Sequence, residues 1–297
     1  MSRFEKTILK DDEGRTVKDI LKKEFSLSKR LRAKLKNEES LVLVNGKQAQ
    51  GWFPLSEGDV ITVTFPEEHS SFLPQNIPFT IIYEDSDLLC IDKPAGLVCH
   101  PTKGHPLGTL SNGIQHYMEQ SCQNFKIRFI NRLDMDTSGL VLVSKNSHAQ
   151  YAFTKASEQG KTIKKYIALV NGIIIEDEGI IDLPIGQDDP SSLKRNVTPS
   201  GLESTTHFKT LKRFEKNFTL LELTLKTGRT HQIRVHLSHK GFPVTGDYLY
   251  GGECPTIISR QALHASSLSF PHPLTKEQIT LNAPLPSDIK RAIEILS

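Results

Sequence analysis

Apolar residues of this chain gather in short runs separated by turn-forming residues, which is the pattern of β-strands joined by hairpins. Residues 79–93 predict a strand, a turn and a second strand, because an Asp-Ser-Asp sequence interrupts two apolar runs. Single strands are predicted for residues 139–145, 164–172 and 218–228. The larger part of the chain is therefore expected to form a sheet.

Two segments show the spacing of helices instead. Residues 147–160, SHAQYAFTKASEQG, predict a helix with Ser147 as its N-cap and Gly160 beyond its end. Residues 229–241 predict a second helix, which Gly241 closes. Helices inserted among hairpin strands predict the α+β class, with a mixed and largely antiparallel sheet.

The first 65 residues predict a small α/β unit of their own, in which two basic helices precede a hairpin. The first helix is expected at residues 16–25 and the second at residues 29–36, with Ser28 as the N-cap of the second. The apolar positions of the two helices are Val17, Ile20, Leu21, Phe25, Leu31 and Leu35. An Asn-Gly turn at Asn45 then follows a strand, and residues 55–65 add a turn and an alternating strand.

Residues 66–78 contain three prolines, two glutamates and two serines, with little periodicity. Such a composition is typical of a linker. We therefore expect residues 1–65 to be joined through it to a larger domain of residues 79–297. No repeat with a period of 20 to 50 residues is seen.

Composition narrows the classes of protein. The 297 residues are enough for two domains, and no window approaches the ~18 consecutive apolar residues of a membrane span. The charged amino terminus lacks the apolar core of a secretory signal, so we expect a soluble cytoplasmic protein. The four cysteines form no CxxC pair, which predicts reduced thiols rather than a zinc site or disulfides. We expect a monomer that does not bind membranes.

Positive charge is concentrated in the amino-terminal unit. The formal net charge is only +3, but eight basic residues stand against two acidic ones between Lys18 and Lys36. Together with the hairpin and its VNGK sequence, this arrangement resembles the alpha-L motif, an RNA-binding module shared by a ribosomal protein and several RNA-modifying enzymes. The resemblance implies RNA as a partner. The alternative is a solvated basic face on an ordinary helical hairpin.

The stretch INRLDMDTSGLVLVSKN, residues 130–146, places Arg132 and Asp134 just before a turn and an apolar strand. A lone pair of this kind is usually a surface salt bridge worth under ~1 kcal/mol. Arg234, however, lies close to the apolar face of a predicted helix, where an arginine needs an anion as its partner. Tyr166 lies in an apolar strand, where its hydroxyl also needs a partner or a task.

The same stretch resembles the RLD-x-x-TSG motif of the RluA-type pseudouridine synthases, a family that isomerises uridines in ribosomal and transfer RNA. The segments DKPAGLVCHP, KKYIALV, TGRTHQIRVH, GDYLYGG and LHASSLSFPHPLT are similar to the other motifs of the family and occur in the same order. The resemblance covers residues 79–285, and a basic module ahead of it is typical of the branch that modifies large-subunit ribosomal RNA. Asn131 stands where relatives commonly have histidine.

The resemblance implies an RNA pseudouridine synthase that uses no cofactor, no nucleotide and no metal. Pseudouridine forms when the bond from uracil N1 to ribose C1′ breaks, the base turns, and C5 joins C1′ without loss of an atom. Asp134 would be the catalytic carboxylate, as nucleophile or as base on the sugar. Arg234 would pair with Asp134 and fix its orientation. Tyr166 would lie against the uracil ring and help to remove the C5 proton.

The residues that contact the RNA also follow from the resemblance. The target base must be flipped out of its stack, and Arg132 would fill or brace the gap that it leaves. The other residues expected to bind the substrate are Arg229, Thr230, His231 and Gln232. Asp136, Thr137 and Ser138 are interpreted as turn residues, because Asp and Ser cap backbone N–H groups.

Two other functions fit parts of the sequence. LDMDTSG is similar to the DxDxT signature of aspartate-nucleophile phosphatases, which need a parallel strand before the motif and a late carboxylate cluster for magnesium. Only Asp247 is available there. The amino-terminal unit alone would suffice for a non-catalytic RNA-binding assembly factor. His236 and His239 share a helical face, but no glutamate accompanies them as in an HExxH zinc site.

Overall fold

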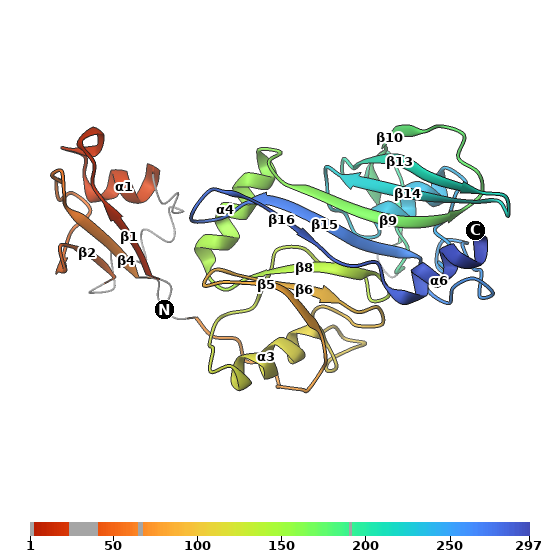
Figure 1. The fold of residues 1–297 in the computed structure, drawn as a ribbon, viewed down its shortest axis with the longest axis horizontal. Helices are drawn as coiled ribbons and strands as arrows, with labels where there is room; N and C mark the ends of the chain where they lie inside the picture. The colour runs from red at the N-terminus through yellow and green to blue at the C-terminus, as the bar shows by residue number, and fades with distance from the viewer. Residues whose placement is uncertain (1–2, 24–40, 65–67, 190–191) are drawn as a thin grey trace.

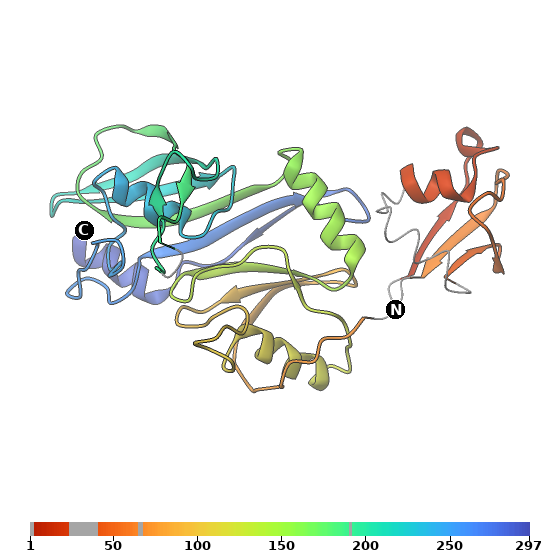
Figure 2. The same cartoon turned by 180° about the vertical axis from the view of Figure 1, so that it is seen from behind.

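The computed structural model describes residues 3–23, 41–64, 68–189 and 192–297, and Figures 1 and 2 show its two sides. The helices are α1 (Val17–Lys23), α3 (Leu110–Gln120), α4 (Ser147–Glu158), α5 (Gln232–His239) and α6 (Ser287–Leu296), with a 3-10 helix at Lys10–Asp12. The strands are β1 (Arg3–Thr7), β2 (Val42–Val44), β3 (Lys47–Gln48), β4 (Val60–Thr64), β5 (Thr80–Glu84), β6 (Leu88–Lys93), β7 (Arg128–Phe129), β8 (Ser138–Ser144), β9 (Ile163–Asn171), β10 (Glu178–Asp182), β11 (Ile185–Gly186), β12 (Asn196–Val197), β13 (Thr205–Phe214), β14 (Phe218–Leu225), β15 (Leu263–Pro271) and β16 (Gln278–Asn282). No described helix has both the length and the apolar character needed to cross a bilayer.

The amino-terminal unit is a four-stranded antiparallel sheet, in the order β1-β4-β2-β3, with α1 packed against it. Val17, Ile20 and Leu21 of α1 are buried in its core, as their spacing predicted. Asn45 and Gly46 have φ values of 50° and 76°, the left-handed pair that a two-residue hairpin turn requires. Strand β1 was not predicted. The predicted second helix, with its N-cap and Phe25, lies outside the described residues.

The larger sheet has ten strands. Its main path runs β10-β13-β14-β9-β15-β8-β6-β5, while β16 pairs with β15 and β7 with β8. Neighbouring strands are antiparallel except β8 and β15, which run parallel. This arrangement confirms the predicted α+β class and its largely antiparallel sheet. It also places β8, β15 and β9 side by side, which brings together segments that lie far apart in the sequence (Figure 1).

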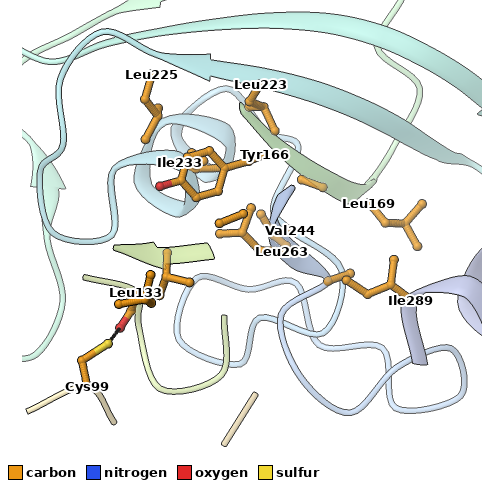
Figure 3. Packing of buried hydrophobic residues seen from close by; sticks show 14 of the residues in the cluster. Cys99, Leu133, Tyr166, Leu169, Leu223, Leu225, Ile233, Val244, Leu263 and Ile289 are labelled. Atoms are coloured by element: carbon orange, nitrogen blue, oxygen red, sulfur yellow. Dashed lines mark hydrogen bonds between the residues drawn. The ribbon is translucent and has the colours of Figure 1, made fainter. Parts of the chain in front are cut away.

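Both faces of this sheet are buried where β6 and β8 run. Alternate residues of the two strands, Leu89, Ile91, Val141 and Val143, join a core with side chains of α3, α5 and α6. The residues between them, Leu88, Cys90, Leu140 and Leu142, pack with side chains of α4 and β16. Figure 3 shows part of the first core, in which Tyr166 lies among apolar side chains. Because each face of the sheet packs against its own core here, the sequences of β6 and β8 are nearly continuous apolar runs.

Helix α4 begins one residue earlier than its predicted cap implies. The cap is Asn146, whose side-chain oxygen accepts a hydrogen bond from the backbone N–H of Ala149 at 2.8 Å, so the prediction of Ser147 was wrong. Ser147 is instead the first helical residue. Asn146 is in the extended backbone region that an N-cap needs, and its amide also donates to Asp87 at 2.6 Å. This tertiary contact favours asparagine as the cap.

The segment between the two units is bound to the larger one. Ser70 Oγ accepts from the backbone N–H of Ile127 at 2.8 Å, and the Leu73 carbonyl accepts from the Asn112 side chain at 2.8 Å. The Gln75 side chain accepts from the N–H of Gly108 at 2.7 Å. We propose the domain boundaries 1–65 and 79–297. Residues 68–78 of the connecting segment are held by these hydrogen bonds to the surface of the larger unit near α3.

Gly139 provides a test of how closely β8 and β15 approach. Its φ is +110°, and a Cβ there would lie 2.3 Å from the carbonyl oxygen of Ala265. We expect Gly139→Ala to lower the free energy of unfolding by more than about 3 kcal/mol, because the clash is with backbone. Gly160, with φ +70° and nothing near its missing Cβ, is the control: Gly160→Ala should cost about 1–2 kcal/mol. Urea unfolding measures both, and equal losses would contradict the close approach.

Candidate active site

Three separate segments meet at one pocket of about 60 Å³. The loop before β8 contributes Arg132 and Asp134, β9 contributes Tyr166, and the start of α5 contributes His231 and Arg234. The loop and the strand approach each other because β15 lies between β8 and β9 in the sheet. The pocket is thus a product of strand order rather than of sequence proximity.

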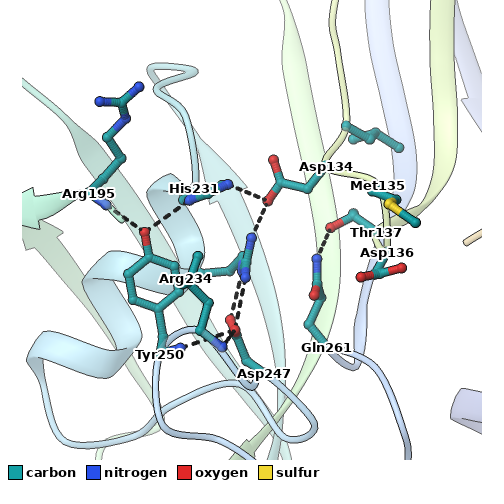
Figure 4. A network of polar contacts seen from close by, with 12 residues as sticks. Asp134, Met135, Asp136, Thr137, Arg195, His231, Arg234, Asp247, Tyr250 and Gln261 are labelled. Atoms are coloured by element: carbon teal, nitrogen blue, oxygen red, sulfur yellow. Dashed lines mark hydrogen bonds and ion pairs between the residues drawn. The ribbon is translucent and has the colours of Figure 1, made fainter. Parts of the chain in front are cut away.

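Arg234 holds two carboxylates at once (Figure 4). Its Nη1 donates to Asp134 Oδ2 at 2.9 Å. Its Nε and Nη2 donate to the two oxygens of Asp247 at 2.7 and 2.8 Å, a two-pronged contact that fixes the plane of the guanidinium. Asp247 is buried and is itself held by the backbone N–H groups of Leu249 and Tyr250. Asp247 therefore orients the arginine, and the arginine orients Asp134.

The electrostatics of Arg234 follow from this arrangement. Burial by itself would lower the pKa of Arg234, but the bonds to Asp247 and the charges of both aspartates raise it above its ordinary value. The guanidinium is therefore a fixed cation. Two carboxylate groups therefore share one guanidinium beside the pocket.

His231 lies between Asp134 and Tyr250. Its Nδ1 is 2.9 Å from the Tyr250 hydroxyl oxygen, and its Nε2 is 3.8 Å from Asp134 Oδ2. The hydroxyl of Tyr250 also accepts from the backbone N–H of Arg195 at 2.8 Å. Burial lowers the pKa of His231, although the charge of Asp134 acts in the opposite direction. A neutral imidazole thus faces the carboxylate.

Tyr166 presents an apolar ring to the pocket. It is 8% exposed, and no hydrogen bond of its hydroxyl is found among the described residues. Burial and the charge of Asp134 raise the pKa of Tyr166, so the side chain is a neutral phenol at neutral pH.

The other residues predicted to bind the substrate lie in three different places. Arg132 and Arg229 are exposed side chains at the pocket. Thr230 lines a neighbouring hollow instead. Gln232 is buried: its Oε1 accepts from Thr227 and from the N–H of Arg229, and its amide donates to two groups on β13. These four bonds make Gln232 a brace for the turn before α5.

Two residues of the surrounding motifs hold the loop that carries Asp134. Lys93, at the end of β6, is buried, and its ammonium donates to the carbonyls of Pro94, Leu97 and Met135 at 2.8 to 2.9 Å. Burial lowers the pKa of Lys93 to about 8. Asn131, the residue that departs from the family pattern, donates to the Leu140 carbonyl and accepts from the Leu142 N–H on β8. It fastens the loop to the strand that follows.

The turn after Asp134 closes with a hydrogen bond from the Thr137 N–H to the Asp134 carbonyl at 3.1 Å. The Thr137 hydroxyl accepts from Gln261 at 3.2 Å, and the Ser138 hydroxyl lies 3.0 Å from His264 Nδ1. The backbone bond is that of a turn, as expected, but the two hydroxyls bond to distant side chains and not to backbone N–H groups of the turn.

Within the described residues, one group of side chains has the spacing of a metal site: Asp85, Asp87 and His272. His272 Nε2 bonds to Asp85 at 2.8 Å, while its Nδ1 accepts two backbone N–H groups. Both nitrogens are thus already used. The group lies at the opposite end of β6 and β8 from Asp134, because Leu88 pairs with Ser144 and Lys93 with Gly139. His236 is likewise occupied, by Thr206 and by the Leu183 carbonyl.

Sequence reasoning did not assign Asp247, Tyr250 or Lys93 to the site. Asp247 and Tyr250 lie in GDYLYGG and Lys93 in DKPAG, both of which had been matched as motifs. A usable signal existed for Asp247, since a buried arginine requires a buried anion. Tyr250 and Lys93 carried none, because both act through backbone groups of distant segments.

Two family models match the chain. Residues 87–239 match the family model described as RNA pseudouridylate synthase, and residues 4–61 match the RluD ribosomal pseudouridine synthase N-terminal domain. An uncharacterised RNA pseudouridine synthase of Bacillus subtilis, YlyB, is 42% identical over 263 residues, covering 87% of this chain and 86% of its own. Ribosomal large subunit pseudouridine synthase D of Haemophilus ducreyi is 38% identical, with coverages of 90% and 86%.

A solved structure shares the fold. Human RNA Pseudouridylate Synthase Domain Containing 4 aligns with a TM-score of 0.59 at 22% identity, covering 73% of this chain and 92% of its own. The phosphatase alternative is not favoured. The strands flanking the aspartate motif are mostly antiparallel, and Asp247 is bound to Arg234.

The Arg234 bridge predicts a specific pattern of stability. Arg234→Ala should lower the free energy of unfolding by about 3–5 kcal/mol, because it leaves the buried Asp247 carboxylate without its cation. Adding Asp247→Asn should recover part of that loss, since the uncompensated charge is then removed. Arg234→Lys should lie between the wild type and Arg234→Ala, because lysine restores charge but not the fork. Urea unfolding of the four proteins measures this, and a double variant less stable than Arg234→Ala would contradict it.

Proposed function

The chain belongs to the RNA pseudouridylate synthase family, and from this premise we propose that it isomerises particular uridines of large-subunit ribosomal RNA, with Asp134 as its catalytic carboxylate. The observation that carries the proposal is the bond between Arg234 and Asp134 in a pocket that also contains Tyr166. Ribosomal RNA is supported by the names of several relatives and of the matched amino-terminal domain. A cytoplasmic location suits this substrate.

The two oxygens of Asp134 have different tasks in this proposal. Oδ2 is held by Arg234 and lies beside His231. Oδ1 has no hydrogen-bond partner among the described residues, so it is the oxygen left to act on the sugar. It does so either by attack at C1′ or by removal of a sugar proton, and both routes need a carboxylate with a fixed orientation in a site that excludes water.

Tyr166 acts on the base. The neutral phenol packs against the uracil while the N1–C1′ bond breaks and the ring turns. Once C5 has joined C1′, the C5 proton must leave to restore the ring. The neutral Tyr166 hydroxyl takes part as a relay, accepting that proton while its own proton passes to the uracil N1 that the broken bond left free. A raised pKa suits the first task, because a charged phenolate beside Asp134 would be repelled.

Arg132 and Arg229 belong to the RNA-binding surface in this proposal. Both are exposed at the pocket, where a flipped uridine would enter. Arg132 would occupy the space that the uridine leaves in the RNA. His231 and Thr230 would contact the substrate on the α5 side, while Gln232 holds the turn from which they extend.

Asp134→Asn should abolish pseudouridine formation while RNA binding persists. Asparagine keeps the size of the side chain but removes the charge that acts on the sugar. The measurement is tritium release from C5-labelled uridine in a large-subunit ribosomal RNA transcript, with a filter-binding assay in parallel. Activity should fall at least about 1,000-fold, in line with the loss of a group that acts in the transition state.

Asp136→Asn is the matched control, since it removes a carboxylate from the same loop, two residues further on. It should retain activity within about threefold of the wild type. Equal activity losses in the two variants would remove Asp134 from its central role. Tritium release by the wild type also separates the synthase from a non-catalytic RNA-binding factor.

The amino-terminal unit should supply affinity without choosing the uridine. Phosphate contacts made by basic side chains release counterions, so they make affinity fall with salt and carry little sequence information. Removal of residues 1–64 should weaken RNA binding and flatten its salt dependence, while the modified position stays the same. This boundary retains Glu68 and Ser70, which are bound to the larger domain.

A variant with the unit intact sharpens this test. Lys18 and Lys22 are exposed on α1. The double variant Lys18→Ala, Lys22→Ala should reduce the slope of log binding constant against log salt concentration by about one to two. Each phosphate that a lysine no longer neutralises reduces this slope by roughly 0.7–0.9. Binding constants at several salt concentrations give the slopes. Unchanged slopes and affinities after removal of residues 1–64 would mean that the basic residues are an ordinary solvated surface.

A further inference from the structure

A second hollow lies beside the catalytic pocket. It has a volume of about 400 Å³, and Arg229 lines both cavities. Its walls are β11 with Gln187, residues 200–202, and the turn at residues 228–230. We call this hollow the side cleft. A nucleotide is of the size that such a cavity can hold.

The side cleft is positively charged. Arg195 and Arg229 line it, and no aspartate or glutamate does. Among the described residues, neither guanidinium forms a salt bridge: Arg229 donates to the Glu203 backbone carbonyl, and Arg195 is held through its backbone N–H. Cations without acidic partners are suited to an anion from outside the protein.

An exposed apolar side chain adjoins these charges. Leu202 is 61% exposed in the wall of the side cleft, whereas Ile185 beside it is only 4% exposed. An inorganic anion would gain nothing from a leucine. A nucleotide offers both a phosphate for the arginines and a flat apolar face for Leu202.

We propose that the side cleft binds a nucleotide that neighbours the target uridine in the same RNA strand, with its phosphate against Arg195 and Arg229 and its base against Leu202. This inference rests on the proposed function. Arg229 connects the two cavities, so a strand whose uridine occupies the catalytic pocket has its adjoining nucleotide at the entrance of the side cleft. Arg195 lies close enough to the catalytic cluster to contribute to lowering the pKa of His231. Figure 4 shows Arg195 on the Tyr250 side of that cluster.

The wall that carries Leu202 is rigid before any ligand binds. Leu202 and Ile185 exchange two backbone hydrogen bonds, at 2.8 and 2.9 Å. Gly201 packs so closely that a Cβ there would lie 2.4 Å from the carbonyl carbon of Ile185. A preformed wall reduces the entropy lost on binding, and it lets the cleft select neighbours by shape. The side cleft would thus contribute to the choice of uridine.

The test uses the full chain and begins with a transcript of large-subunit ribosomal RNA, in which the position of the new pseudouridine is mapped. A short RNA containing that uridine is then made in an intact form and in abasic forms. Each abasic form lacks one base, at the first or second position on the 5′ or the 3′ side of the uridine. Tritium release gives kcat and KM for the wild type, Leu202→Ala and Arg195→Ala on every RNA. Thermal melting checks that each variant is folded.

On intact RNA, Leu202→Ala should raise KM about fivefold and Arg195→Ala about tenfold, with kcat nearly unchanged. On the RNA that lacks the base bound in the side cleft, the wild type should have the same raised KM as Leu202→Ala has on intact RNA. Leu202→Ala should not raise KM further on that RNA. Arg195→Ala should still raise KM on that RNA, because the abasic nucleotide keeps its phosphate. Leu202→Met keeps the apolar surface and should behave as the wild type.

Matched controls lie away from the cleft: Leu211→Ala on β13 and Arg291→Ala on α6 should leave KM unchanged. The inference is overturned if Leu202→Ala has no effect on KM, or if its effect is the same on every abasic RNA. A wild-type chain that makes no pseudouridine in the transcript would instead refute the proposed function. The inference would then fall with it.

Discussion

The bridge that Arg234 forms between Asp134 and Asp247 is the interaction on which the rest of the site depends. The Arg234 guanidinium and the Asp247 carboxylate are buried together, and each charge is stable there because of the other; Asp134 is a partly exposed third partner. Asp247 is the deeper partner, since it is buried and bound by backbone N–H groups as well. Its position fixes Arg234, and Arg234 leaves one Asp134 oxygen free.

The sheet makes this bridge possible. Asp134 and Arg234 are 100 residues apart in the sequence, and the loop before β8 reaches the start of α5 because β15 lies between β8 and β9. The single parallel contact of the larger sheet, between β8 and β15, occurs at Gly139, just after the catalytic loop. The backbones of Gly139 and Ala265 approach each other closely there, five residues after Asp134. Lys93 then holds the same loop from the other side through the Met135 carbonyl.

The two cavities use charge in different ways. In the candidate pocket the buried cation, Arg234, is engaged by two carboxylates, whereas Arg132 and Arg229 are exposed at its rim. In the side cleft, Arg195 and Arg229 have no acidic partner among the described residues, which suits a site for phosphate. Arg229 belongs to both. An RNA strand alternates neutral bases with charged phosphates, so the two environments side by side match the substrate that we propose.

The sequence by itself determined the local elements and the reactive groups. Apolar spacing located α1, α4, α5 and the strands β2 to β6, β8, β9 and β14, because burial of one face imposes a period that short segments reveal. It did not predict helices α3 and α6 or the other strands of the larger sheet. The resemblance to the motifs of the RluA-type family named Asp134, Tyr166 and Arg234 as candidates. The N-cap of α4, strand β1 and the roles of Asp247, Lys93 and Tyr250 were decided only by tertiary structure. Each of these depends on a hydrogen bond or strand pairing between distant segments, and no local pattern records which segments meet.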